Sequence, residues 1–278
     1  MKITELPPLA PGERIDYGPD PNQFAELFVP SGAGPHPCVM FLHGGFWRAA
    51  FGLDHARYLC RALVTEGYAV WSVEYRRVGQ PGGGYPGTLD DIRAAAHRLV
   101  DIPNIDVERV VAMGHSAGGQ LALWLAAQRV IKLAGVVSLG GVCDLRRALE
   151  LNLGRGAAIG FIGSSPEVRP DAYANASPIE LLPFDVPQTL LHGDADDIVP
   201  IELSTGFAHA SPNARLVRLT GADHFDVIDP RSPHWPRVIA EVGRFVHQPR
   251  SDSDRRVNLV EGSFDVADSP TGYDQAHP

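Results

Sequence analysis

Residues 114–119 have the sequence Gly-His-Ser-Ala-Gly-Gly, and the interpretation of the whole chain starts from this stretch. It follows the apolar run 109–113 and opens into the segment 120–127, whose apolar residues recur at helical spacing. Gly-x-Ser-x-Gly between a strand and a helix predicts a nucleophile elbow, in which a strained turn presents the hydroxyl of Ser116 at the carboxyl edge of a sheet. An ordinary glycine-rich turn between a strand and a helix is the alternative interpretation.

The remainder of the chain predicts more strands and helices in alternation. Several apolar runs are continuous, which is typical of strands covered on both faces. The predicted strands are 24–29, 38–42, 68–74, 109–113, 133–139, 188–192 and 215–219, and the predicted helices are 53–65, 88–100, 120–127, 202–210 and 236–246. This alternation predicts an α/β fold with a mostly parallel central sheet and helices on both faces.

The same pass along the chain divides it into segments. Residues 1–22 are Pro-rich and are expected to form an extended N-terminal arm, and residues 23–248 the α/β domain. Within that domain, residues from about 144 to 183 interrupt the alternation, so we expect a small helical cap insertion over the serine that shapes its pocket. The tail 249–278 is polar and aperiodic, and is expected to be disordered and dispensable for chemistry.

Composition restricts the classes of partner. The formal net charge is −9 with no basic cluster, which argues against a surface for nucleic acid or anionic membrane. The sequence contains no run of 18 consecutive apolar residues, so it predicts no membrane span. The N-terminus lacks the apolar stretch of a signal peptide. The odd number of cysteines, Cys38, Cys60 and Cys143, in apolar segments predicts buried free thiols and a reducing compartment. We therefore expect a soluble, cytoplasmic protein.

A second informative stretch, His-Gly-Gly-Phe-Trp at 43–47, directly follows the predicted buried strand 38–42. Acyl transfer requires N–H donors where the carbonyl oxygen becomes negative, and glycines let a loop turn its N–H groups toward that position. We assign the N–H groups of Gly45, Phe46 and Ala117 as the oxyanion hole. The alternative interpretation of Phe46 and Trp47 is that both are core aromatics. His43 is interpreted as a hydrogen-bonded scaffold residue.

Three residues in chain order complete a candidate catalytic set. A serine hydroxyl needs an imidazole to take its proton, and the imidazole needs a carboxylate to orient it. Ser116, Asp196 and His224 occur in the order expected on an α/β-hydrolase sheet, and the last two each follow a predicted strand. Asp194 and Asp197 crowd the same loop as Asp196; Asp197 and then Asp194 are the alternative choices.

No cofactor or metal is expected. His43, His115 and His192 each end a predicted strand, but none has a paired-ligand spacing such as His-x-x-x-His. The glycine-rich loop 79–86 lacks the endings of phosphate-binding motifs. A metal-dependent hydrolase is retained as an alternative, and so is a non-catalytic ligand-binding protein on the same fold.

Taken together, the motifs at 43–47 and 114–119, the Glu-Tyr-Arg stretch at 74–76, the loop of Asp196 and Gly-Ala-Asp-His-Phe at 221–225 resemble the α/β-hydrolase superfamily over about residues 15–248. The 43–47 loop is similar to the form found in kynurenine formamidase (arylformamidase) and related small esterases, and departs from the His-Gly-Gly-Gly form of hormone-sensitive-lipase-like esterases. The resemblance implies a cofactor-free serine hydrolase that cleaves a small carboxylic ester or an N-formyl arylamide through an acyl-enzyme. The expected partner is that small-molecule substrate, with a homodimer left open.

Overall fold

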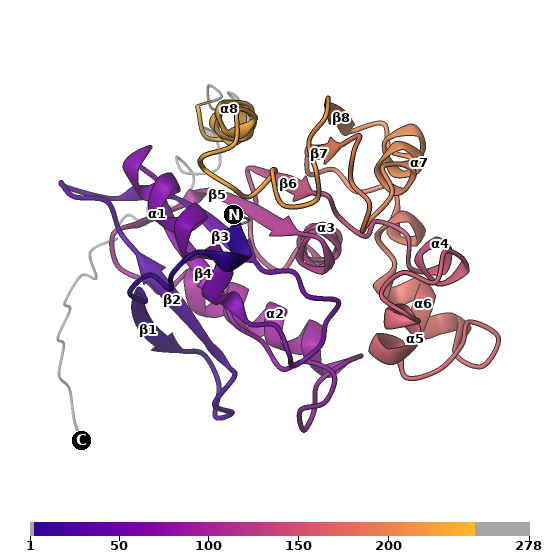
Figure 1. Ribbon diagram of the computed structural model, residues 1–278. Helices are drawn as coiled ribbons and strands as arrows, with labels where there is room; N and C mark the ends of the chain where they lie inside the picture. Colours follow the sequence, from indigo (N-terminus) through magenta and orange to yellow (C-terminus); the bar gives the residue numbers. More distant parts are fainter. Residues whose placement is uncertain (1–2, 248–278) are drawn as a thin grey trace, which may run out of the picture. The chain divides into compact units, whose positions relative to one another are not determined.

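An eight-stranded sheet forms the centre of the computed structural model, which describes residues 3–247 (Figure 1). The strands are β1 (Glu13–Asp16), β2 (Phe24–Phe28), β3 (His36–Leu42), β4 (Ala69–Val73), β5 (Ile105–His115), β6 (Gly135–Leu139), β7 (Gln188–Gly193) and β8 (Ala214–Leu219). Their order is β1-β2-β4-β3-β5-β6-β7-β8, and every pair from β4 onward is parallel, whereas β1 and β2 are antiparallel to their neighbours. The prediction of a mostly parallel sheet is confirmed.

Helices cover both faces of this sheet, as predicted. They are α1 (Arg57–Thr65), α2 (Gly87–Leu99), α3 (Ala117–Gln128), α4 (Leu145–Glu150), α5 (Ala157–Ile162), α6 (Pro170–Ala176), α7 (Glu202–Ala210) and α8 (Trp235–Val246). Successive residues of a strand point to opposite faces. Met40 of β3 accordingly joins a core with α2 and α3, and its neighbour Phe41 joins a second core with α1 and α8. None of the helices in residues 3–247 has the length and apolar composition needed to cross a bilayer.

The three cysteines lie inside these cores as predicted. Cys38, Cys60 and Cys143 are buried free thiols. Burial raises the pKa of each thiol to about 12, so all three are protonated at neutral pH.

The N-terminal segment is more structured than the expected arm. Its residues Glu13–Asp16 form β1, which pairs with β2 at the edge of the sheet, and Ile3 is buried at 2% exposure. The sequence missed β1 because the strand is short and largely exposed, so it carries no continuous apolar run. The predicted disordered tail, 249–278, lies outside the described residues.

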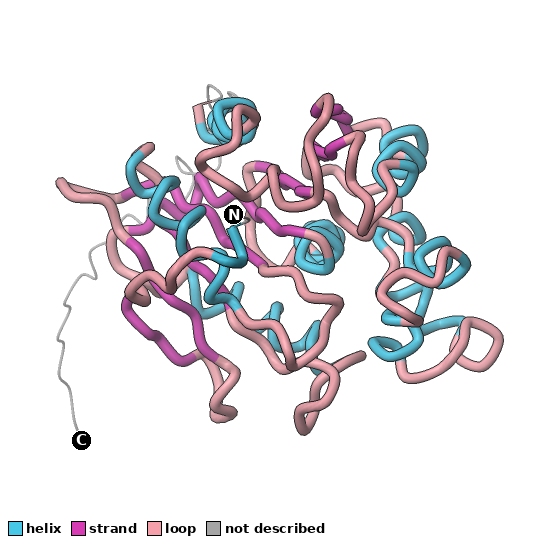
Figure 2. Tube along the Cα trace, in the orientation of Figure 1, coloured by secondary structure: helices cyan, strands magenta, loops and turns pink. Residues whose placement is uncertain are grey.

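The insertion at 144–183 is helical, as expected. It contains α4, α5 and α6 and a 3₁₀ turn at Pro178–Leu181. Figure 2 shows these short helices joined by loops at one side of the sheet. Tyr173 and Phe161 are buried and fasten the insertion to the same core as α2 and α3.

A tight turn between β5 and α3 confirms the predicted elbow geometry. Ser116 has a left-handed φ of 57°, and its N–H donates to the carbonyl of Leu139 on β6 at 2.9 Å. A Cβ added at Gly118 would lie 1.9 Å from the carbonyl oxygen of Leu42, and one at Gly114 would lie 2.0 Å from that of Gly118. Glycine is therefore required at both positions for β3, β5 and α3 to meet at the serine.

We expect Gly118→Ala to lower the free energy of unfolding by about 2–3 kcal/mol, because the added methyl group overlaps backbone atoms that cannot move independently. Gly160→Ala in α5 is the matched control, since a Cβ there meets no atom within 4 Å. The control should be neutral or slightly stabilising, because alanine favours helix more than glycine. Urea unfolding curves measure both, and equal stability of the two variants would contradict the proposed close approach.

Candidate active site

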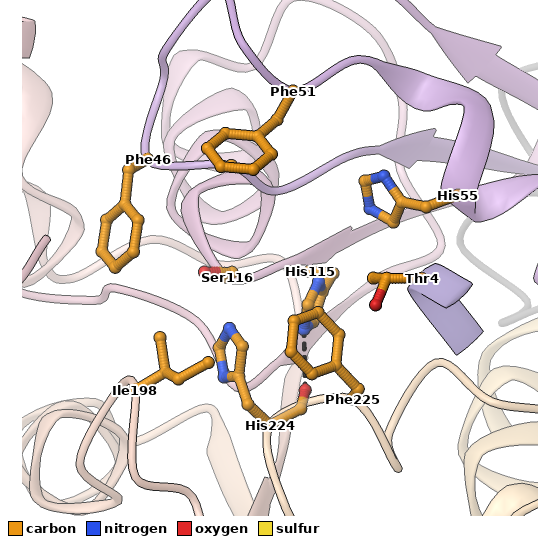
Figure 3. Close-up of a pocket in the computed structure, with 10 residues that line it drawn as sticks. Thr4, Phe46, Phe51, His55, His115, Ser116, Ile198, His224 and Phe225 are labelled. Atoms are coloured by element: carbon orange, nitrogen blue, oxygen red, sulfur yellow. Dashed lines mark hydrogen bonds between the residues drawn. The ribbon is translucent and has the colours of Figure 1, made fainter. Parts of the chain in front are cut away.

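A pocket of about 200 Å³ lies at the carboxyl edge of the sheet, over the elbow (Figure 3). Four of its residues, Gly45, Phe46, Ser116 and His224, were predicted as site residues from the sequence. The pocket is lined by Thr4, Gly45, Phe46, Phe51, His55, His115, Ser116, Ile198, His224 and Phe225. Of the other six, Thr4, Phe51, His55 and Ile198 come from short 3₁₀ turns and loops that carry no motif, whereas His115 and Phe225 stand next to Ser116 and His224 in their motifs.

No residue of the insertion at 144–183 is among those that line this pocket, but Gly154 of the insertion lies against the ring of Phe46, which does. The insertion also supports the 43–47 loop from the side. The ring of Phe161 stacks on Trp47 with centroids 4.7 Å apart, and Arg48 donates to the carbonyl of Gly154. Trp47 is thus a core aromatic, whereas Phe46 is a pocket residue.

Ser116 and His224 lie next to each other on the pocket wall (Figure 3). Both are 3% exposed. Among the described residues no hydrogen bond joins the two side chains. Catalytic hydrogen bonds are often long in unliganded sites and tighten when substrate binds, so the arrangement suits a serine and its base.

Asp196 is the acid that reaches His224. Its Oδ2 lies 2.6 Å from Nδ1 of His224, and its Oδ1 accepts the N–H groups of Ile198 at 3.0 Å and Val199 at 2.8 Å. The alternative acid Asp194 instead accepts the N–H of Gly221 at 2.7 Å. The carboxylate of Asp196 is therefore held by four neighbouring groups once His192 is included.

His192 is a second histidine on that carboxylate. Its Nε2 lies 3.2 Å from Oδ2 of Asp196 and 2.8 Å from the carbonyl oxygen of Val199, and its Nδ1 lies 2.7 Å from Oγ of Ser204. Burial alone raises the pKa of Asp196, but hydrogen bonds from His192 and His224 outweigh it and hold the pKa below the ordinary value of 3.8. Asp196 is therefore ionised at neutral pH. The only signal for His192 in the sequence is its place at a strand end, four residues before Asp196.

His115, the residue before the serine, supports His224 through the backbone. Its Nε2 lies 2.8 Å from the carbonyl oxygen of His224, so this nitrogen carries the proton and donates (Figure 3). The two rings lie 4.5 Å apart between centroids. Burial, and next the neighbouring His224, lower the pKa of His115 well below 6.5. The ring is thus neutral at neutral pH and orients the loop of His224.

The 43–47 loop carries two non-glycine residues in left-handed backbone conformation, Phe46 with φ 53° and Trp47 with φ 56°. Gly45 has φ 115°. The N–H groups of Gly45, Phe46 and Ala117 donate no hydrogen bond to any residue in 3–247. Three free donors next to a serine are what an oxyanion hole requires.

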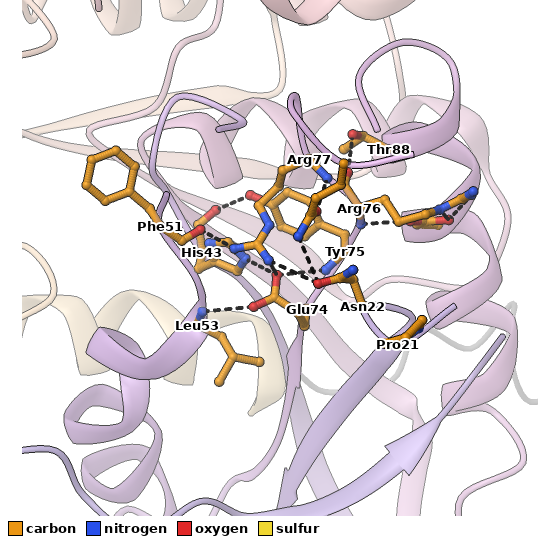
Figure 4. Close-up of polar contacts among 12 residues, drawn as sticks. Pro21, Asn22, His43, Phe51, Leu53, Glu74, Tyr75, Arg76, Arg77 and Thr88 are labelled. Carbon is orange, nitrogen blue, oxygen red and sulfur yellow. Dashed lines mark hydrogen bonds and ion pairs between the residues drawn. The ribbon is translucent and has the colours of Figure 1, made fainter. Parts of the chain in front are cut away.

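A buried ionic cluster lies beneath that loop (Figure 4). His43 is fully buried, its Nε2 lies 2.9 Å from Oε1 of Glu74, and its carbonyl accepts the hydroxyl of Tyr75 at 2.8 Å. Glu74 also accepts the N–H of Leu53 at 3.2 Å and pairs with Arg77 at 3.2 Å. Burial opposes the charge of Glu74, but His43 and Arg77 lower its pKa overall. His43 has the scaffold position expected from the sequence.

Residues 3–247 contain no group of three or more His, Cys, Asp or Glu side chains arranged to hold a metal ion. The three histidines at strand ends have separate partners: Glu74 for His43, the His224 carbonyl for His115, and Ser204 with Asp196 for His192.

The lowered pKa of Asp196 predicts a specific dependence of stability on pH. A carboxylate whose folded pKa lies below its unfolded pKa stabilises the folded state above the unfolded value, and this contribution is lost as pH falls. Relative to wild type, Asp196→Asn should therefore lose about 2 kcal/mol at pH 7, and the difference should shrink between about pH 5 and about pH 3. Urea unfolding at several pH values measures it. A difference that stays constant or grows toward low pH would show that the charge of Asp196 is not stabilised by folding.

The chain is similar to known esterases of the α/β-hydrolase fold. The profile of the BD-FAE family matches residues 26–210, a range that includes Ser116 and Asp196 and ends before His224. The carboxylesterase/phospholipase LipF of Mycobacterium tuberculosis is 28% identical over 279 aligned positions, covering 90% of this chain and 73% of LipF. The kynurenine formamidase of Meyerozyma guilliermondii is 26% identical over 146 positions, covering 49% of this chain and 54% of that enzyme.

Solved structures show the same fold. Esterase B from Lactobacillus rhamnosis superposes with a TM-score of 0.72 at 20% identity, covering 90% of this chain and 88% of that one. A likeness at this identity demonstrates a shared α/β-hydrolase architecture. The profile match over most of the domain and the esterases among the relatives agree, and the chain belongs to the BD-FAE family, an esterase family of the α/β-hydrolase fold.

Proposed function

We propose that this esterase is a serine hydrolase that cleaves a small carboxylic ester through an acyl-enzyme, with Ser116, His224 and Asp196 as its catalytic triad. The observation that carries the proposal is the contact of 2.6 Å between Nδ1 of His224 and a buried, ionised Asp196, beside a serine at a strained elbow. Asp196 keeps the proton of the neutral imidazole on Nδ1, which leaves Nε2 free to accept one.

The steps of the proposed reaction follow from this placement of the proton on His224. Oγ of Ser116 attacks the ester carbonyl carbon and its proton passes to Nε2 of His224, while the carbonyl electron pair moves to the oxygen. The free N–H groups of Gly45, Phe46 and Ala117 stabilise this oxyanion. His224 then returns the proton to the departing alcohol as the carbon–oxygen bond breaks. Water, deprotonated by His224, releases the acyl group by the same steps.

An N-formyl arylamide is the second candidate substrate. It is favoured by the Phe46-Trp47 form of the loop and by the similarity of half of the chain to a kynurenine formamidase. The pocket suits either class, because a volume of about 200 Å³ with phenylalanine walls accepts a small acyl or aromatic group. A cytoplasmic location and activity without a metal complete the proposal, and full activity after dialysis against a chelator is the expected result.

Ser116→Ala should abolish turnover of p-nitrophenyl acetate, p-nitrophenyl butyrate and N-formylkynurenine, because no nucleophile is left to form the acyl-enzyme. Steady-state kcat/KM of the wild type on the three substrates ranks ester against formamide. Activity that survives in Ser116→Ala would refute the triad. Absence of turnover by the wild type on every ester and formamide tested would favour a ligand-binding role.

Gly45→Ala should lower kcat by about 10²–10³, the usual loss when one oxyanion donor is misplaced. The new Cβ would lie 2.4 Å from Cβ of Phe51, and φ is 115°, so the loop must shift. The control is Gly79→Ala, which also has a positive φ of 100° but meets only Ala49 at 3.6 Å, outside the pocket. Equal kcat values for the two variants would argue against a role for the Gly45 loop in the transition state.

A further inference from the structure

The pocket over Ser116 adjoins a second and larger space. A groove of about 450 Å³ runs between the N-terminal segment 3–8 and the segment 50–58. Four residues, Thr4, Phe51, His55 and Phe225, line both the pocket and the groove. The two spaces therefore adjoin at these side chains, and the proposed cleavage of a small ester does not need the second one.

The N-terminal wall of the groove is firmly attached to the domain. Ile3 is buried, and the hydroxyl of Tyr58 donates to the carbonyl of Pro7 at 2.8 Å. Further along, Arg57 donates to the carbonyl of Leu9 at 3.3 Å and Arg61 to that of Ala10 at 3.0 Å. These bonds fasten the segment to α1, so the groove has two structured walls before any ligand arrives.

The chemistry of the lining is mainly apolar. Its side chains include Leu6, Pro7, Pro8, Ala50, Phe51 and Tyr58. Asp54 is the one carboxylate among the groove-lining residues, and it pairs with Arg57 at 2.8 Å. His55, at the junction, is neutral at neutral pH because burial, and then the neighbouring His43, lower its pKa to about 4. No cationic side chain among these lining residues is available to bind an anionic group.

We propose that the groove is a second substrate compartment, which takes an extended, uncharged, apolar alkyl or aryl group joined to the ester carbonyl or to the leaving oxygen. The proposal rests on the proposed function, because it requires the ester bond to lie at Ser116. The groove adjoins the pocket at Thr4, Phe51, His55 and Phe225, so an extended molecule that passes between these side chains would occupy both spaces. Each methylene that enters the groove should raise kcat/KM about three- to fourfold, the usual gain on removing one from water.

Two substrate series distinguish the two sides of the ester. In the first, p-nitrophenyl esters from acetate to octanoate lengthen the acyl group; in the second, acetates of alcohols from ethanol to octanol lengthen the leaving group. For the wild type, kcat/KM should rise at least about tenfold along one series. A rise in the first places the acyl chain in the groove, and a rise in the second places the leaving group there.

Ala50→Trp tests the location, because this exposed residue lines the groove and not the pocket. It should lower kcat/KM for the longest member of the rising series by about tenfold or more and leave the shortest member within about twofold. Pro8→Trp fills the groove from the opposite wall and should act in the same way. Ala49→Trp is the matched control, an adjacent exposed alanine that lines neither space, and should change nothing.

The proposal is overturned if neither series rises, or if both groove variants leave the long substrate unaffected, or if they lower short and long substrates equally. These outcomes are separate from failure of the proposed function, which would appear as acetate hydrolysis that persists in Ser116→Ala. Thermal unfolding of each tryptophan variant confirms that the compared proteins are folded.

Discussion

The left-handed backbone of Ser116 is the constraint on which the site depends. An L-residue adopts φ near 57° only when its surroundings impose it, and here β3, β5, β6 and α3 do so together. The Ser116 N–H is bound to Leu139, and two glycines let backbones meet where a single methyl group would not fit. Packing across the sheet compensates for the strain in the backbone of Ser116. This backbone conformation places the serine hydroxyl in the pocket, next to the N–H of Ala117 at the start of α3, which is unpaired within residues 3–247.

Two buried polar assemblies position the groups around that serine. On one side, the carboxylate of Glu74 contacts His43 and Arg77 and accepts the N–H of Leu53. These contacts join the end of β3, where the 43–47 loop begins, to the segment that carries Phe51. On the other, Asp196 is held by His192 and the 198–199 backbone while it binds His224. Each carboxylate is buried, and each has its pKa lowered by its partners. A buried charge of this kind costs stability unless it is fully hydrogen-bonded, so both assemblies also fix the loops that satisfy them.

The sequence predicted the parts of the site that local pattern specifies. The strand, turn and helix at 109–127 follow from apolar spacing and glycines, and the order of Ser116, Asp196 and His224 follows from strand ends that meet at one edge of a parallel sheet. Long-range packing decides the rest. Thr4 and Phe51 line the pocket because distant segments fold against α1. The edge strand β1 carries no apolar signal, and the stacking of Phe161 of the insertion on Trp47 joins residues far apart in the sequence. These contacts join segments that are far apart in the sequence, and no local residue pattern predicts them.

Covalent labelling of the native protein tests the central claim most directly. A fluorophosphonate reacts with a serine only when a base removes its proton and an oxyanion hole stabilises the adduct. After a short reaction with the full chain, peptide mass spectrometry should find one adduct on Ser116, and the Asp196→Asn and Ser116→Ala proteins should be labelled slowly or not at all. Rapid labelling of another residue, or a wild-type protein that remains unmodified, would contradict the account.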